Sequence, residues 1–245
     1  MEPPVDRSFK ISTLSSPLIK ASEFARISRD GVLNGVEVDL LDSMRFRLQG
    51  WHAAPSDVTR HVDTVWFQPP LEKRVPEKAL GLIRERVDQN LPARLVIDQL
   101  RGSEGETHDK QINLAIQLRR NLPETVRITI GIRPSSIENT RAHLARLAAL
   151  RMQASEWDLD LAIDLGRELD WLWEAEAALY RIIGSLALVR LSYPTETFDG
   201  RFRASLSQRT VLTCAELDYR GAFSLIVPMP WWHWRNAKSL EAACL

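Results

Sequence analysis

Ionisable and polar side chains stand at the ends of several short apolar runs in this sequence. In LDLAIDLGRE (159–168), for example, Asp164 closes an apolar run and Arg167 follows it. The full group comprises Glu37, Asp39, Gln68, Asp98, Arg133, Asp164, Arg190 and Ser192. A carboxylate can act as a general base, and a guanidinium offers a planar fork of donors to carboxylate or phosphate. Brought together, these residues would form a mixed-charge pocket for a small polar or anionic molecule.

The elements that would position this group are strands that alternate with helices. Apolar or β-branched runs recur at intervals of roughly 30 residues, with helical periodicity between them. We predict strands over 9–15, 35–41, 63–68, 94–100, 126–133, 159–165, 186–192 and 222–228. This alternation predicts a parallel sheet, and eight strands close a barrel, so the expected fold is α/β, a single-domain (β/α)8 TIM barrel.

The main alternative is an open doubly wound sheet. Such a sheet usually carries a glycine-rich phosphate loop after its first strand, and STLSSPLIKAS (12–22) has none. Helices are predicted over 20–31, 77–90, 109–122 and 136–152. The polar segment 99–110 is expected to be a loop, either a lid over the barrel mouth or an ordinary solvated connection.

Side-chain alternation predicts which strand residues face the barrel interior. In 126–133 and 159–165 one parity is entirely apolar and should pack beneath the helices. The other parity should face inward, and it holds Arg127, Thr129, Gly131, Arg133, Asp160, Ala162 and Asp164. Arg127 and Asp160 lie near the amino ends of their strands and are expected to pair across the barrel floor.

The charged groups at the carboxyl ends of the strands need partners, because an unpaired buried charge costs several kcal/mol. They can satisfy one another as structural ion pairs, or they can receive a ligand at the face where TIM barrels carry their active sites. Both interpretations stay open at this point.

Composition excludes several classes of function. The 245 residues are 44% hydrophobic and 26% charged, with 32 basic and 32 acidic side chains, so no net field attracts nucleic acid or an anionic membrane. The first ten residues, MEPPVDRSFK, do not resemble a signal peptide, and no apolar run is long enough to span a bilayer. We therefore expect a cytoplasmic protein, with a flexible tail over 1–8 and a tail or helix over 236–245.

A tryptophan-rich segment follows the last predicted strand. PMPWWHW (228–234) places Trp231 and its neighbours at the barrel rim, where aromatic rings could stack on a sugar or other flat ligand. The same residues are equally suited to a buried clasp or to the subunit interface of a homo-oligomer.

Four segments, DGVLNGVEVDLLD, LAIDLGRELD, LALVRLSYP and LDYRGAFSL, resemble the xylose isomerase-like TIM barrels, a superfamily of sugar and sugar-phosphate isomerases and epimerases. The matching positions include Gly-Val-Glu at 35–37 and Asp-x-Gly at 164–166. The resemblance implies a divalent metal that polarises a hydroxy-ketone for proton or hydride movement.

The metal ligands that the resemblance implies are mostly absent. The corresponding positions hold Gly131 or Arg133, Asp164, Arg167, Arg190, Tyr193 and Ile226. Only Asp164 is kept, so no cofactor is predicted, and fixed guanidinium groups take the place of metal-binding groups.

Two hypotheses follow. The first is a divergent, metal-independent isomerase or epimerase, acting on a small polar or anionic sugar-like molecule through an enediol. Its catalytic residues would be Glu37, Asp98 and Asp164, with Glu37 or Asp98 moving the proton. Its substrate contacts would be Gln68, Arg133, Arg167, Arg190, Ser192, Tyr193 and Trp231. The second is a non-catalytic barrel that binds a ligand or protein partner through the same rim.

Overall fold

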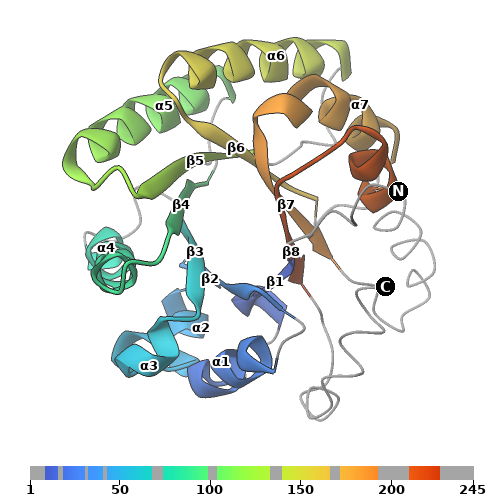
Figure 1. Ribbon diagram of the computed structural model, residues 1–245. Coiled ribbons are helices and arrows are strands. Elements are labelled where there is room, and N and C mark those ends of the chain that lie inside the picture. The colour runs from blue at the N-terminus through green and yellow to red at the C-terminus, as the bar shows by residue number, and fades with distance from the viewer. Residues whose placement is uncertain are drawn as a thin grey trace.

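The protein forms one closed barrel of eight parallel strands, with helices around the outside (Figure 1). This computed structural model describes residues 9–15, 19–30, 33–40, 43–67, 74–98, 104–132, 140–165, 172–192 and 210–226. Strands follow one another around the barrel in chain order, and β1 closes the ring on β8. The predicted (β/α)8 fold is therefore confirmed, and the open doubly wound alternative is excluded.

All eight predicted strands are present, with ends that differ by a few residues. They are β1 Phe9–Ser12, β2 Gly35–Asp39, β3 Val62–Phe67, β4 Ala93–Ile97, β5 Val126–Ile132, β6 Asp160–Asp164, β7 Leu186–Ser192 and β8 Ala222–Ile226. Most of the predicted strands run on past the observed carboxyl ends.

The helices cover the outer face of the barrel. They are α1 Ala21–Arg29, α2 Ser43–Leu48, α3 Ser56–Thr59, α4 Arg74–Asp88, α5 Glu104–Asn121, α6 Thr140–Glu156 and α7 Leu172–Ile182, with 3-10 turns η1 Thr13–Ser15, η2 Trp51–Ala53 and η3 Ile183–Ser185. Residues 210–216 are also helical. Helix α5 begins at Glu104, inside the segment 99–110 that was expected to be a loop. No helix in these ranges is both long and apolar enough to cross a bilayer.

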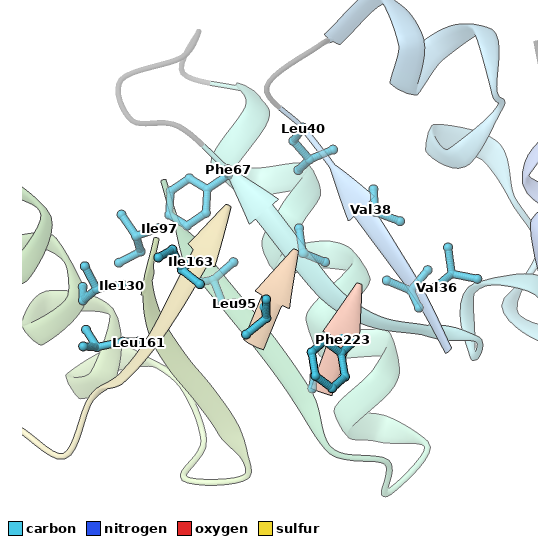
Figure 2. Packing of buried hydrophobic residues seen from close by; sticks show 14 of the residues in the cluster. Val36, Val38, Leu40, Phe67, Leu95, Ile97, Ile130, Leu161, Ile163 and Phe223 are labelled. Atoms are coloured by element: carbon cyan, nitrogen blue, oxygen red, sulfur yellow. The ribbon is translucent and has the colours of Figure 1, made fainter. Parts of the chain in front are cut away.

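Alternation along the strands places one apolar parity beneath the helices, as predicted, and the structure adds a second, smaller apolar layer inside the barrel. The outward parity packs under the helices and includes Val36, Val38, Ile130, Leu161 and Ile163 (Figure 2). The inward parity builds a small apolar layer inside the barrel from Trp66, Val96, Ala162, Leu188 and Ala222. Polar side chains occupy the interior on either side of this layer.

The amino end of the barrel, called the floor below, contains an ion pair between Lys10 of β1 and Asp63 of β3. Asp63 is the extra residue of a bulge, because Val36 of β2 pairs with Val62 while Glu37 pairs with Thr64. A bulge turns a side chain away from its regular alternation, which here gives Lys10 its partner. The predicted pair of Arg127 with Asp160 is absent from the described part of the chain, where Arg127 is exposed.

Candidate functional site

Arg190 lies at the centre of a polar cluster at the carboxyl end of the barrel, called the mouth below. It comes from β7, where it pairs in register with Asp164 of β6, and its side chain is fully buried. The inward parity of β7 explains this placement, because Val189 and Leu191 on either side of Arg190 pack into the outer core. A permanently charged group without solvent must find its partners inside the barrel.

Glu37 of β2 supplies the shortest of these contacts. The guanidinium Nε of Arg190 donates to Glu37 Oε1 over 2.8 Å, and Nη2 lies 2.6 Å from the same oxygen. Strands β1 and β8 stand between β2 and β7 in the ring (Figure 1), so this ion pair crosses the barrel interior. It ties together two strands that share no ladder hydrogen bonds.

Two further carboxylates meet the other edge of the guanidinium. Nη1 of Arg190 donates to Asp164 Oδ2 over 3.0 Å and lies 3.1 Å from Asp39 Oδ2. The side chains of Asp39 and Asp164 are each at most 1% exposed to solvent. One guanidinium thus joins three carboxylates from β2 and β6, with its planar fork spanning all of them.

Trp66 of β3 closes one face of the guanidinium. Its ring centroid lies 3.7 Å from the Arg190 Cζ, a cation–π contact, and its indole Nε1 donates to Glu37 Oε2 over 2.7 Å. Both carboxylate oxygens of Glu37 are therefore engaged, one by Arg190 and one by Trp66. This arrangement fixes the orientation of all three side chains.

Burial and neighbouring charges shift the pKa values of this cluster. Desolvation raises the pKa of Glu37, the charge of Arg190 opposes that shift, and the charges of Asp39 and Asp164 reinforce it. The pKa of Arg190 is raised above its ordinary value, because its three carboxylate neighbours outweigh the desolvation that would lower it. Arg190 therefore stays a cation within the cluster.

Asp98 follows β4 at the same end of the barrel and is fully buried. Gln111 of α5 joins the two strands next to Asp98. Its amide Nε2 donates to the carbonyl of Ile97 in β4 over 3.1 Å and to that of Gly131 in β5 over 3.0 Å. A Cβ atom at Gly131 would lie 2.9 Å from Trp66 Cζ3 and 3.0 Å from the Ile97 carbonyl. Gly131 thus leaves the space in which the Trp66 ring can lie under Arg190.

The turn after β1 is fastened to the mouth by side chains from neighbouring segments. The backbone N–H of Asp39 donates to Thr13 Oγ1 over 3.0 Å, which positions Asp39 directly. Gln49 Nε2 donates to the Thr13 carbonyl over 2.8 Å, and Arg45 Nη1 to the Leu14 carbonyl over 2.9 Å. These bonds satisfy backbone groups that the turn would otherwise bury unpaired.

The structure brings together four of the residues that the sequence predicts at the strand ends, Glu37, Asp39, Asp164 and Arg190, and places Asp98 at the same end of the barrel. Ser192 ends β7, but its side chain lies outside the described part. Five other predicted residues also lie outside it, namely Gln68, Arg133, Arg167, Tyr193 and Trp231, as do the expected tails.

Sequence reasoning missed the roles of Trp66 and Gln111. Parity does place Trp66 inside the barrel, but the stacking on Arg190 leaves no trace in the pattern. Gln111 is a fully buried polar residue on α5, and its only signal in the sequence is that it interrupts an apolar stripe.

The carboxylate side chains at the mouth, in their folded positions, do not form a site for a divalent metal ion. Such ions bind to oxygen ligands in numbers of six or more, or to clustered histidine and cysteine. In the residues that the structure describes, no group of three or more histidine, cysteine, aspartate or glutamate side chains is arranged to hold a metal ion. Instead, the three carboxylates face the guanidinium of Arg190.

No protein-family model and no curated protein sequence matches the chain. Solved structures do match its fold. One is a xylose isomerase-like TIM barrel/4-hydroxyphenylpyruvate dioxygenase fusion protein, with a TM-score of 0.56 and 14% identity over 89% of this chain. This chain spans only 38% of that fusion protein.

Two other matches extend over nearly the full length of both chains. The probable 3-DHS dehydratase from Bacillus anthracis has a TM-score of 0.59 at 9% identity, covering 96% of this chain and 97% of its own. The 3-keto-D-glucoside 4-epimerase from E. coli has a TM-score of 0.56 at 13% identity, covering 98% and 100%. The chain therefore has the fold of the xylose isomerase-like TIM barrels.

Proposed function

We propose that this protein is a sugar or sugar-phosphate isomerase or epimerase that binds a small polar or anionic molecule at the barrel mouth without a divalent metal. The observation that carries the proposal is the ionisable cluster of Glu37, Asp39, Asp164 and Arg190, drawn from three strands to the face where TIM barrels carry their sites. The 4-epimerase among the similar structures supports the reaction class, while the dehydratase indicates that this fold also serves other chemistry.

The reaction would proceed by proton transfer next to a carbonyl. A carboxylate removes the proton from the hydroxyl-bearing carbon beside the carbonyl group, which gives an enediolate and a carboxylic acid. In isomerisation that acid returns the proton to the neighbouring carbon while the hydroxyl proton passes to the other oxygen, and in epimerisation a second acid protonates the opposite face. Glu37 and Asp98 are the candidate bases. The geometry favours Asp98, because both oxygens of Glu37 already accept hydrogen bonds from Arg190 and Trp66.

The remaining predicted residues would bind the substrate. Under this proposal, Asp164 and Arg190 keep the cluster in place at the bottom of the site. Arg133 and Arg167 hold the anionic end of the molecule, since a guanidinium can bind carboxylate or phosphate with two parallel hydrogen bonds. Gln68, Ser192, Tyr193 and Trp231 contact its hydroxyl groups and ring face.

The proposal is tested by hydrogen exchange. The protein is incubated in D2O, with a chelator present, with a panel of ketohexoses, their phosphates and 3-keto-glucosides, and proton NMR follows the C–H groups beside each carbonyl. We expect loss of one such signal with at least one compound, and at least a hundredfold slower loss with Asp98→Asn, the range that a general base contributes. Exchange that requires an added metal, or its absence with every compound, would contradict the proposal.

A non-catalytic binding barrel is the second candidate. The complete enclosure of the Glu37–Arg190 pair favours it, because both side chains are 0% exposed and are engaged by each other, by Trp66 and by Asp164. This candidate predicts that a compound from the same panel binds in calorimetry while its C–H signals persist unchanged in D2O.

A further inference from the structure

A group of basic side chains lies among the helix ends at the floor, opposite to the mouth. Helix α3 packs between α1 and α4 (Figure 1), and His61 stands directly before β3, where its carbonyl accepts the N–H of Val36 over 2.8 Å. Arg29 is the last residue of α1, Arg60 follows α3, and Arg86 lies in the last turn of α4. These three arginines and His61 are called the floor cluster below.

The charges of all three arginines act on His61. The Nε of Arg60 donates to His61 Nε2 over 3.4 Å, and the imidazole is only partly exposed. Burial is the largest cause of the lowered pKa of His61, and the three arginine charges lower it further. Salt screens such effects over a length of about 10 Å. The three guanidinium groups therefore lie near one imidazole, which stays neutral.

Arg86 is buried beneath this cluster without a carboxylate of its own among the described residues. It is 9% exposed, and its Nε has no hydrogen-bond partner there. Desolvation lowers its pKa, and the nearby charge of Asp63 opposes that shift. Asp63 is already paired with Lys10, however, so its charge is not available to Arg86 alone. A buried cation is costly unless it is paired, and an anion bound at this place would remove the cost.

The charge near the floor cluster indicates which anion would fit. Lys10 and Asp63 balance each other, and Asp57 is the acidic residue that opposes the effect of the arginines on His61. Three guanidinium groups against that one carboxylate leave an excess of two positive charges. A phosphate group carries about −1.5 to −2 near neutral pH, and guanidinium groups bind its oxygens through charge-assisted hydrogen bonds.

We propose that the floor cluster binds a phosphate group, either inorganic phosphate or the phosphate of a small ester. Arg86 holds the phosphate from the buried side, while Arg29 and Arg60, which are both exposed, bind it from the solvent side. This second site goes beyond the proposed function and does not depend on it, because no residue of the mouth takes part.

The pKa of His61, measured by proton NMR on the full chain, tests the inference. Its C2–H signal is identified as the one missing from His61→Gln, and its pKa is compared in inorganic phosphate, in glycerol phosphate and in chloride of equal ionic strength. We expect either phosphate to raise the pKa of His61 and the melting temperature, because a bound anion offsets the arginine charges. Tighter binding of the ester would indicate a phosphorylated metabolite, and tighter binding of the free ion would indicate phosphate itself.

Two arginines of α4 give a matched pair of variants. Arg86→Met removes the buried guanidinium and should weaken phosphate binding at least about tenfold, the value of a hydrogen bond to a charged group. Arg84→Gln removes an exposed charge from the same helix and should leave the binding unchanged.

Three results would overturn the inference: a His61 pKa that neither phosphate changes, a change that chloride reproduces in full, or equal phosphate affinity in wild type and Arg86→Met. If Arg86→Met does not fold, the double variant Arg29→Gln/Arg60→Gln decides, because it alters exposed side chains alone. Weaker binding in the double variant supports the site, and unchanged binding refutes it. A failure of the sugar-exchange assay changes none of these results.

Discussion

The two ends of the barrel pair their buried charged side chains in different ways. At the floor, Lys10 and Asp63 form a one-to-one ion pair, and 19% of the Asp63 side chain is exposed to solvent. At the mouth, three carboxylates share one guanidinium, and no side chain among the four is more than 1% exposed. The floor pair has one charge of each sign and is partly exposed, whereas the mouth cluster has three carboxylates to one guanidinium and is shielded from bulk solvent.

This difference indicates which cluster serves stability alone. A buried ion pair often contributes little compared with apolar residues of similar volume, because desolvation offsets the attraction between the charges. The floor pair reduces that cost by keeping Asp63 in contact with water. The mouth cluster bears the full cost at the face where barrels carry their sites, and this favours a role for it beyond closing the interior.

The largest expected effect contrasts the two cations by a matched substitution. Arg190→Met leaves Glu37, Asp39 and Asp164 buried without their shared guanidinium and should lower the free energy of unfolding by about 3–5 kcal/mol. Lys10→Met leaves Asp63 within reach of water and should cost about 1.5–3 kcal/mol, the value of a hydrogen bond to a charged group. Urea denaturation of both variants measures the two costs, and equal costs would remove the distinction between floor and mouth.

A smaller effect is expected when a methyl group is placed beside Trp66. Gly131→Ala brings a Cβ to 2.9 Å from Trp66 Cζ3 and 3.0 Å from the Ile97 carbonyl, so the indole must shift from the position in which it stacks on Arg190. Overpacking of this kind costs about 1–3 kcal/mol. Thermal and urea denaturation measure the cost, and a change in near-ultraviolet circular dichroism reports the movement of the tryptophan.

Gly81 provides the control for that change. It lies in α4, and among the described residues no atom outside the adjoining turns of its own helix lies within 4 Å of the position of an added Cβ. Gly81→Ala should therefore raise the free energy of unfolding by up to about 1 kcal/mol through helix propensity alone. If both glycine variants shift stability in the same direction, packing at Gly131 is not the reason for its glycine.

The strands and the inward parity could be predicted from the sequence because both follow from local periodicity. Glu37, Asp164 and Arg190 were placed at one mouth in this way, and the structure joins them in one cluster. The choice of partners could not be predicted, because it depends on distances across the barrel. The alternation of residues along the strands does not predict that Arg190 pairs with Glu37, which lies beyond two intervening strands around the barrel. It also does not predict that Arg127 is exposed.

Local irregularities and packing explain the other contacts that the sequence pattern does not predict. The bulge that turns Asp63 toward Lys10 breaks the alternation on which the parity argument rests. Gln111 reaches the carbonyls of Ile97 and Gly131 because α5 packs on β5 in one particular position, which helical periodicity alone does not set. The positions of Trp66 and Gln111 therefore follow from packing, and their functional value can be tested only by substitution.

The last expected effect is a pH-dependent drift in stability that belongs to the mouth. The pKa of Glu37 is raised above its ordinary 4.5, so the folded chain holds a proton there more tightly than the unfolded chain does. Its contribution to the free energy of unfolding is then fully present below 4.5 and is lost as the pH rises through the folded-state pKa. Glu37→Gln cannot titrate and lacks this drift.

Urea denaturation of wild type and Glu37→Gln across a pH series isolates the drift, because the other titrating groups largely cancel in the difference. We expect the stability of wild type relative to Glu37→Gln to fall as the pH rises, by about 1.4 kcal/mol for each unit of pKa shift. A rise with pH would mean that attraction to Arg190 outweighs burial and holds the pKa of Glu37 below 4.5. Glu37 would then be a permanent counter-ion of Arg190, and proton transfer at the mouth would be left to Asp98 alone.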